Sequence, residues 1–107
     1  YFEAKAGAKY VNEKKSFQSY FLTFEGGSRL EIMQMPGIAA SPNSATVQSY
    51  GLIHFAISVG STANVDALTE RLLRDGHTVA GNPRWTGDGY YESVILDPDG
   101  NRIEITI

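Results

Sequence analysis

Residues 92–105, Glu-Ser-Val-Ile-Leu-Asp-Pro-Asp-Gly-Asn-Arg-Ile-Glu-Ile, repeat in outline residues 19–32, which read Ser-Tyr-Phe-Leu-Thr-Phe-Glu-Gly-Gly-Ser-Arg-Leu-Glu-Ile. The two stretches align at a constant offset of 73 residues, the difference between Glu31 and Glu104, and this offset also pairs Gly27 with Gly100. Each copy predicts a strand, a tight turn and a second strand. The sequence therefore predicts two halves built alike and related by a pseudo-twofold axis.

The repeat places one glutamate in the middle of the last strand of each half. A carboxylate in mid-strand is costly to bury unless a cation or a hydrogen-bond donor meets it. A pseudo-twofold axis would set Glu31 and Glu104 facing each other. A divalent metal ion is the simplest partner that both carboxylates could share.

Size and composition exclude several classes of protein. A chain of 107 residues is predicted to form one domain with a modest core. The formal net charge of −3 gives no electrostatic reason to expect nucleic acid or an anionic membrane as partner. The chain has no cysteine, which excludes disulfides and thiolate sites, and its longest apolar run is too short to cross a bilayer. A cytoplasmic protein is the default expectation.

The second half of the chain predicts one strand, one helix and three further strands. Ser61 or Thr62 can cap the helix, and Gly76 is expected just after its end. Asn82-Pro83 and the glycine-rich loop after it are expected to stop the second strand. The four strands are expected at residues 52–59, 77–84, 90–96 and 102–107.

Shifting this pattern back by 73 residues predicts strands at 4–11, 17–23 and 29–34. The fold class is therefore α+β, with paired βαβββ modules that form a curved mixed sheet. The opening strand and most of the helix of the first module map before residue 1, so we expect them to be missing from this chain. Within a single domain, we expect the remainder of the first module at 1–35, a linker at 36–50 and the second module at 51–107.

Strand alternation predicts which side chains share a face of the sheet. On the last strand Arg102, Glu104 and Thr106 should face one way, with the isoleucines facing the other way under the helix. The same alternation puts Glu31 and His54 on the inner faces of their own strands. Three ligand-type residues on the inner faces of three strands predict a metal site.

Three segments resemble the vicinal oxygen chelate superfamily, most closely glyoxalase I-type proteins. They are Leu-Ile-His-Phe-Ala-Ile-Ser-Val (52–59), Leu-Asp-Pro-Asp-Gly-Asn-Arg-Ile-Glu-Ile (96–105) and Arg-Leu-Glu-Ile-Met (29–33). The resemblance implies Glu31, His54 and Glu104 as metal ligands and a fourth ligand on the missing opening strand. It also implies Glu104 as the catalytic base, with Glu31 as its symmetry-related alternative, and a homodimer.

The implied activity is that of a metal-dependent lyase or isomerase resembling lactoylglutathione lyase. Two carboxylates and neutral donors suit a divalent ion such as Ni²⁺, Zn²⁺, Co²⁺ or Mn²⁺. The expected small-molecule substrate is a hemithioacetal or a similar α-hydroxycarbonyl compound, which reacts through an enediolate while a glutamate moves the proton. Where glyoxalase I carries polar residues for glutathione, this chain has Met33-Gln34-Met35-Pro36, which puts glutathione as the thiol in doubt.

Other interpretations stay open. A bleomycin-resistance-like protein would bind a drug without catalysis, whereas an extradiol dioxygenase or a fosfomycin-modifying enzyme would use three protein ligands, a count that Glu31 does not suit. The two glutamates could also pair with Arg29 and Arg102 as purely structural contacts. Arg84 could meet an anionic group of a substrate or could simply be solvated.

Overall fold

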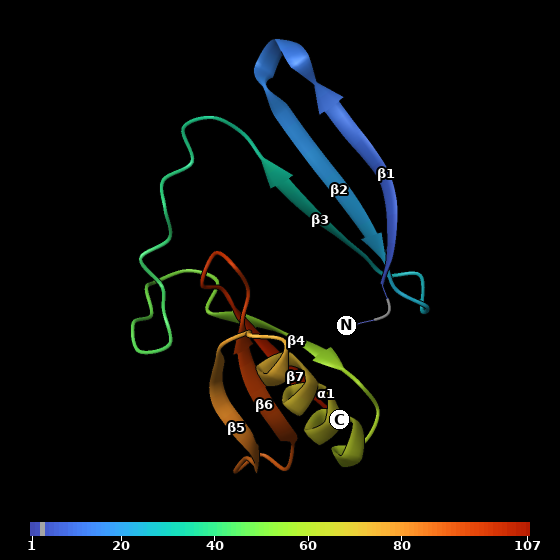
Figure 1. Ribbon diagram of the computed structural model, residues 1–107, viewed down its shortest axis with the longest axis vertical. Helices are drawn as coiled ribbons and strands as arrows, with labels where there is room; N and C mark the ends of the chain where they lie inside the picture. Colours follow the sequence, from blue (N-terminus) through green and yellow to red (C-terminus); the bar gives the residue numbers. More distant parts are fainter. Residues whose placement is uncertain (3) are drawn as a thin grey trace. The chain divides into compact units, whose positions relative to one another are not determined.

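The computed structural model describes residues 1–2 and 4–107, which form two compact units. The first unit comprises Tyr1–Ala39 and the second comprises Ala40–Ile107. The regular structure of these described residues consists of two sheets, one 3₁₀ turn and one α-helix (Figure 1). This arrangement confirms the predicted α+β class.

The first unit is a three-stranded antiparallel sheet in the order β1-β2-β3. Its strands are β1 (Lys5–Asn12), β2 (Phe17–Thr23) and β3 (Arg29–Gln34), within one residue of the predicted bounds. A 3₁₀ turn, η1 (Glu13–Lys15), joins β1 to β2 and ends at Ser16, whose φ of 50° is left-handed.

The second unit is a four-stranded sheet with a helix on one face (Figure 1). Strand β4 pairs in parallel with β7, whereas β7 with β6 and β6 with β5 are antiparallel, so the sheet is mixed as predicted. The elements are β4 (His54–Ser58), α1 (Thr62–Arg74), β5 (Val79–Trp85), β6 (Tyr91–Leu96) and β7 (Arg102–Thr106).

Helix α1 begins and ends at the residues that the sequence predicts. The Ser61 side chain accepts a hydrogen bond from the Asn64 N–H at 3.2 Å, which satisfies a free donor of the first turn. At the other end Gly76 has a φ of 92° and its N–H donates to the Leu73 carbonyl. The His77 N–H donates to the Leu72 carbonyl, which completes a Schellman motif.

The core of the second unit lies between α1 and one face of the sheet. Thr69 on the helix bonds the Ser93 hydroxyl at 2.6 Å, and the Tyr91 hydroxyl donates to Asp66 at 2.8 Å. Odd-numbered residues of β6 therefore face the helix, together with their partners on β7. The buried apolar residues on the two sides of this layer are Val65, Leu72, Ile95, Ile103 and Ile105.

The sequence repeat is reproduced in the backbone of the two turns. The Phe24 N–H donates to the Ser28 carbonyl, and the Gly27 N–H donates to the Phe24 carbonyl, each at 2.9 Å. The equivalent residues 73 positions later make the same two bonds. The Asp97 N–H donates to the Asn101 carbonyl at 2.9 Å, and the Gly100 N–H donates to the Asp97 carbonyl at 3.0 Å. The repeat therefore fixes turn geometry as well as strand position.

Two strands begin two residues later than predicted: β4 begins at His54 rather than at residue 52, and β5 begins at Val79 rather than at residue 77. Asn82-Pro83 lies within β5, which ends at Trp85, one residue beyond its predicted end. The ladder absorbs the proline by a register shift between Gly81 and Arg84, on an edge strand where a missing N–H is tolerated. No helix within residues 1–2 and 4–107 is long and apolar enough to cross a membrane.

Candidate functional site

The candidate site lies on the face of the four-stranded sheet that is turned away from α1, which we call the site face. Strand register puts His54, Ala56, Glu104 and Val94 on this face, because paired residues share a side and alternate residues return to it. The prediction that Glu104 lies opposite the isoleucines of its strand is confirmed, since Ile103 and Ile105 are buried on the helix side.

His54 and Glu104 come together on the site face. His54 Nε2 lies 3.3 Å from Glu104 Oε2, although the two residues are not direct partners in the ladder. Glu104 pairs with Ala56, and His54 stands two residues before Ala56 on β4. The alanine leaves space between the two side chains, so the imidazole reaches the carboxylate diagonally.

Glu92 and Arg84 extend this pair into a row. Arg84 Nη2 lies 3.5 Å from Glu92 Oε1, and the two residues are direct cross-strand partners. Glu92 stands diagonally beside Glu104 because Val94, two residues on, is the partner of Glu104. One residue from each strand thus forms a diagonal row across the site face, in the order His54, Glu104, Glu92, Arg84.

The row is more enclosed at its centre than at its ends. The side chains of Glu104 and Glu92 are 18% and 13% exposed, whereas those of His54 and Arg84 are 44% and 55% exposed. The two carboxylates are therefore partly desolvated while the imidazole and the guanidinium remain accessible. Electrostatic interactions at the centre are correspondingly less screened than at a fully solvated surface.

Burial raises the pKa of the Glu104 carboxyl above its usual value of 4.5. The negative charge of Glu92 raises this pKa further, and Asp88 adds a smaller contribution of the same sign. The positive charges that His54 and Arg84 can carry oppose the rise. The structure therefore places beside His54 a carboxylate that binds a proton more readily than an ordinary glutamate.

Asp88 belongs to the tight loop between β5 and β6. The Thr86 hydroxyl donates to the Asp88 carboxylate, and this bond lowers the pKa of Asp88. The Tyr90 N–H donates to the Thr86 hydroxyl oxygen at 3.2 Å, which ties the two ends of the loop together. The glycine-rich stretch is thus an ordered turn with a fixed negative charge.

Glu31 lies in the first unit, on β3. It pairs with Phe21 in the ladder and is exposed, and Arg29 on the same face lies 5.7 Å above the Phe21 ring. Arg102, the counterpart of Arg29 by the repeat, donates from Nη2 to the Ala45 carbonyl at 2.6 Å. The structure brings together two of the three predicted metal ligands, both in the second unit.

The donors on the site face suit a divalent transition metal. An imidazole nitrogen and a carboxylate oxygen are ligands that Ni²⁺, Zn²⁺, Co²⁺ and Mn²⁺ accept, and His54 and Glu104 already approach each other. Two side chains do not complete a shell. Across residues 1–2 and 4–107, no group of three or more His, Asp or Glu side chains is arranged to hold a metal ion.

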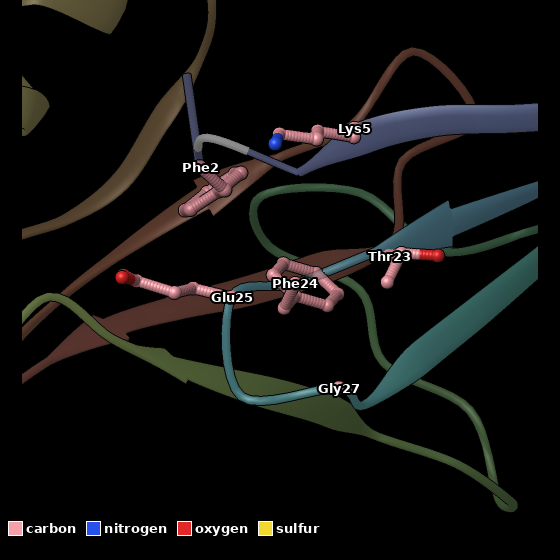
Figure 2. A pocket seen from close by; sticks show the side chains of 6 residues that line it. All are labelled: Phe2, Lys5, Thr23, Phe24, Glu25 and Gly27. Carbon is pink, nitrogen blue, oxygen red and sulfur yellow. The ribbon is translucent and has the colours of Figure 1, made fainter.

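A separate cavity of about 640 Å³ lies in the first unit, beside the turn between β2 and β3 (Figure 2). Phe2 and Phe24 contribute phenyl rings to it, and Lys5 and Glu25 contribute opposite charges. None of the predicted ligands lines this cavity. We therefore assign the candidate site to the diagonal row.

The sequence pattern alone does not identify Glu92 as a site residue. The repeat aligns Glu92 with Ser19, so symmetry gives it no acidic counterpart. Its proximity to Glu104 depends on the register of β6 against β7, which a single sequence does not reveal. The only signal in the sequence was strand alternation, which puts Glu92 on the same face of its strand as Val94 and Leu96.

Comparison with known proteins gives a consistent picture of the fold. Residues 1–105 match the family described as the Glyoxalase/Bleomycin resistance protein/Dioxygenase superfamily. A glyoxylase/bleomycin resistance protein/dioxygenase domain from Frankia sp. is 19% identical with a TM-score of 0.77, and the match covers 98% of this chain and 78% of that one. A glyoxalase family protein from Enterococcus faecalis is 23% identical with a TM-score of 0.75, over 98% and 79% of the two chains.

A mutant of glyoxalase I from Zea mays is 20% identical with a TM-score of 0.73. That match covers 98% of this chain and 36% of the maize chain. At these identities the structural likeness shows the fold. No curated protein sequence matches this chain.

Proposed function

Because the chain belongs to the Glyoxalase/Bleomycin resistance protein/Dioxygenase superfamily, we propose that its site face catalyses a glyoxalase I-type proton transfer on a small α-hydroxycarbonyl compound such as a hemithioacetal. The observation that carries this proposal is the approach of His54 and Glu104 on one sheet face, 3.3 Å apart. The activity is that of a metal-dependent lyase or isomerase.

Glu104 is proposed as the catalytic base. Its carboxylate takes the proton from the carbon that bears the hydroxyl group and returns it to the neighbouring carbon. Its partial burial supports this role, because a partly desolvated carboxylate competes better for a proton than a solvated one. Glu31, its counterpart by the repeat, is the alternative base.

A divalent ion such as Ni²⁺, Zn²⁺, Co²⁺ or Mn²⁺ is proposed as the cofactor. His54, Glu104 and Glu31 would hold it, together with a fourth donor outside this chain's described residues. The ion would polarise the hydroxyl and carbonyl oxygens of the substrate and so acidify the C–H bond of the hydroxyl-bearing carbon. The approach of His54 Nε2 to Glu104 Oε2, 3.3 Å apart, supports a shared role of the two side chains in holding the ion.

The first test measures metal content and activity together. The protein is reconstituted with each of the four ions, the bound metal is counted by mass spectrometry, and the hemithioacetal of methylglyoxal with a small thiol is assayed. Glu104→Gln is expected to lower kcat by about 10²–10⁴-fold, the usual contribution of a positioned base. Glu31→Gln and Glu104→Gln should each weaken metal retention.

A matched control is Glu70→Gln. Glu70 is an exposed glutamate on α1, so its substitution makes the same chemical change on the side of the sheet away from the site face. This variant should keep wild-type metal content and turnover. Failure of the wild-type protein to retain any ion would contradict the proposal, and a drug-binding function without catalysis would then be tested by ligand screening.

A homodimer is proposed on the same family grounds. Light scattering coupled to size-exclusion chromatography tests it directly. A mass near twice 11.7 kDa is expected, and a concentration-independent mass of one chain would contradict it.

A further inference from the structure

Arg84 reaches the site face through a bulge in β5. The ladder pairs Gly81 with Val94 and Arg84 with Glu92, so three steps along β5 oppose two steps along β6. Without the extra residue, Pro83 rather than Arg84 would stand opposite Glu92. Bulges commonly re-aim a side chain in this way beside functional sites.

The guanidinium group of Arg84 lies beside Gly81. A Cβ atom at position 81 would lie 3.7 Å from Arg84 Nη1 and 3.4 Å from the Cβ of Val94. The guanidinium therefore leans back along β5 toward Gly81. Gly81 pairs with Val94 across β5 and β6, and Val94 pairs with Glu104 across β6 and β7. The guanidinium of Arg84, lying beside Gly81, is therefore displaced along the strand direction toward the position of Glu104.

The contact with Glu92 leaves several N–H donors of Arg84 unused. A guanidinium group has five N–H donors in a planar fork, and a bidentate contact with one carboxylate uses two of them. Arg84 Nη2 faces Glu92 at 3.5 Å, while the Arg84 side chain as a whole is 55% exposed. Donors are therefore left for a second anion that approaches from the site face.

We infer that Arg84 binds a singly charged carboxylate at the end of the substrate remote from the reacting carbons, with Glu92 as the residue that positions the guanidinium. The inference rests on the proposed function for the reacting end, which lies at His54 and Glu104. Neighbouring strands lie about 4.8 Å apart, so β5 and β7 are about 10 Å apart across β6. The anion thus belongs on a short arm of the substrate, such as its thiol component.

The charges around Arg84 favour a monoanion over a phosphate group. Glu92 and Asp88 both contribute negative charge to this end of the row. A doubly charged phosphate would meet twice the repulsion that a carboxylate meets, against a single guanidinium. A carboxylate also matches the planar fork of arginine with two parallel hydrogen bonds.

The test compares two substrates that differ only in charge. Methylglyoxal forms hemithioacetals with 3-mercaptopropionate and with 3-mercaptopropionamide, which have the same length and nearly the same shape. We expect kcat/KM of the wild-type protein to be about 10–100-fold higher for the acid, the range of a charged hydrogen-bonded pair. Arg84→Gln should reduce this ratio to about 1 by raising KM for the acid more than for the amide, since any effect of the lost charge on Glu104 acts on both substrates and cancels in the ratio.

Two further variants make the result specific. Arg84→Lys keeps the charge and loses the fork, so it should retain only part of the preference for the acid. Arg74→Gln removes the same charge from the exposed end of α1 and should leave the ratio at its wild-type value. The amide reaction in each variant reports folding and the reacting end independently of the anion.

Binding provides a readout that needs no turnover. Unreactive 3-(methylthio)propionate and its amide are titrated into the wild-type protein and Arg84→Gln by NMR. The acid should bind at least about 10-fold more tightly than the amide, and only in the wild-type protein.

Equal kcat/KM or equal affinity for acid and amide in the wild-type protein would overturn the inference, as would a preference that survives in Arg84→Gln. Turnover of neither substrate by metal-loaded protein would instead overturn the proposed function. In that case the titration still decides whether Arg84 binds the carboxylate.

Discussion

The two sheets of this molecule share a sequence pattern and differ in how their side chains are covered. Ile32 on β3 and Ile105 on β7 are equivalent by the repeat, yet Ile32 is 49% exposed and Ile105 is fully buried. The difference arises because α1 packs on the face that carries Ile105, whereas the described residues of the first unit include no α-helix. Equivalent sequences therefore determine equivalent strands and turns, while burial depends on the element that packs against them.

The largest expected effect separates these two isoleucines. Ile105→Ala should lower the free energy of unfolding of the 107-residue chain by about 3 kcal/mol, because it leaves a cavity in a packed core. Ile32→Ala should cost less than about 1 kcal/mol, because the side chain is already half exposed. Urea denaturation followed by circular dichroism measures both values. Equal losses would show that the face carrying Ile32 is covered as well as that of Ile105.

The two turn glycines provide the next comparison. Gly27 and Gly100 both have a left-handed φ, 84° and 82°, so alanine at either position should cost about 1 kcal/mol. At Gly100 the new Cβ would also lie 2.6 Å from the Asn43 carbonyl oxygen, whereas at Gly27 nothing lies within 4 Å. Gly100→Ala should therefore cost about 2 kcal/mol in total. Thermal denaturation of both variants tests the ranking, and a larger loss for Gly27→Ala would reverse it.

Local features of the sequence predicted most of the fold. Alternation and the repeat placed β2, β3, β6 and β7 within one residue, and the Ser61 cap and Gly76 placed the ends of α1. These features succeed because turn chemistry, helix caps and strand periodicity act over a few residues. They did not predict the bulge at Asn82-Pro83, because whether a proline ends a strand or enters a bulge depends on an edge position that local sequence does not state.

The candidate site was predicted in part. Strand alternation predicted that His54 and Glu104 lie on the inner faces of their strands, and the structure brings the two side chains into contact. Glu92 was missed because its position beside Glu104 follows from cross-strand register, a non-local property. The role of Glu31 stays a prediction, since it lies in the other compact unit.

The smallest expected effect concerns the pH dependence of stability, which depends on the partly buried Glu104. The pKa of Glu104 is raised in the folded chain, so folding favours the protonated carboxyl. The contribution of Glu104 to the stability of the metal-free protein should be fully present below pH 4.5, its usual pKa. This contribution should be lost as the pH rises through the raised pKa of Glu104 in the folded chain. Glu104→Gln should remove this decline and make the metal-free protein more stable at neutral pH.

Denaturant titrations at several pH values between about 4 and 7 measure this dependence. Glu70→Gln, on the exposed face of α1, serves as the control for removing one negative charge. A Glu104→Gln profile parallel to that of the wild-type protein would contradict the prediction.

The bulge in β5 also affects how the molecule meets other chains. β5 is an edge strand of its sheet, and an edge with regular free N–H and C=O groups can recruit a strand from another molecule. Pro83 has no N–H to offer, and the register shift between Gly81 and Arg84 interrupts the spacing of the groups around it. The irregularity that directs Arg84 onto the site face therefore also protects this edge from intermolecular sheet extension and aggregation.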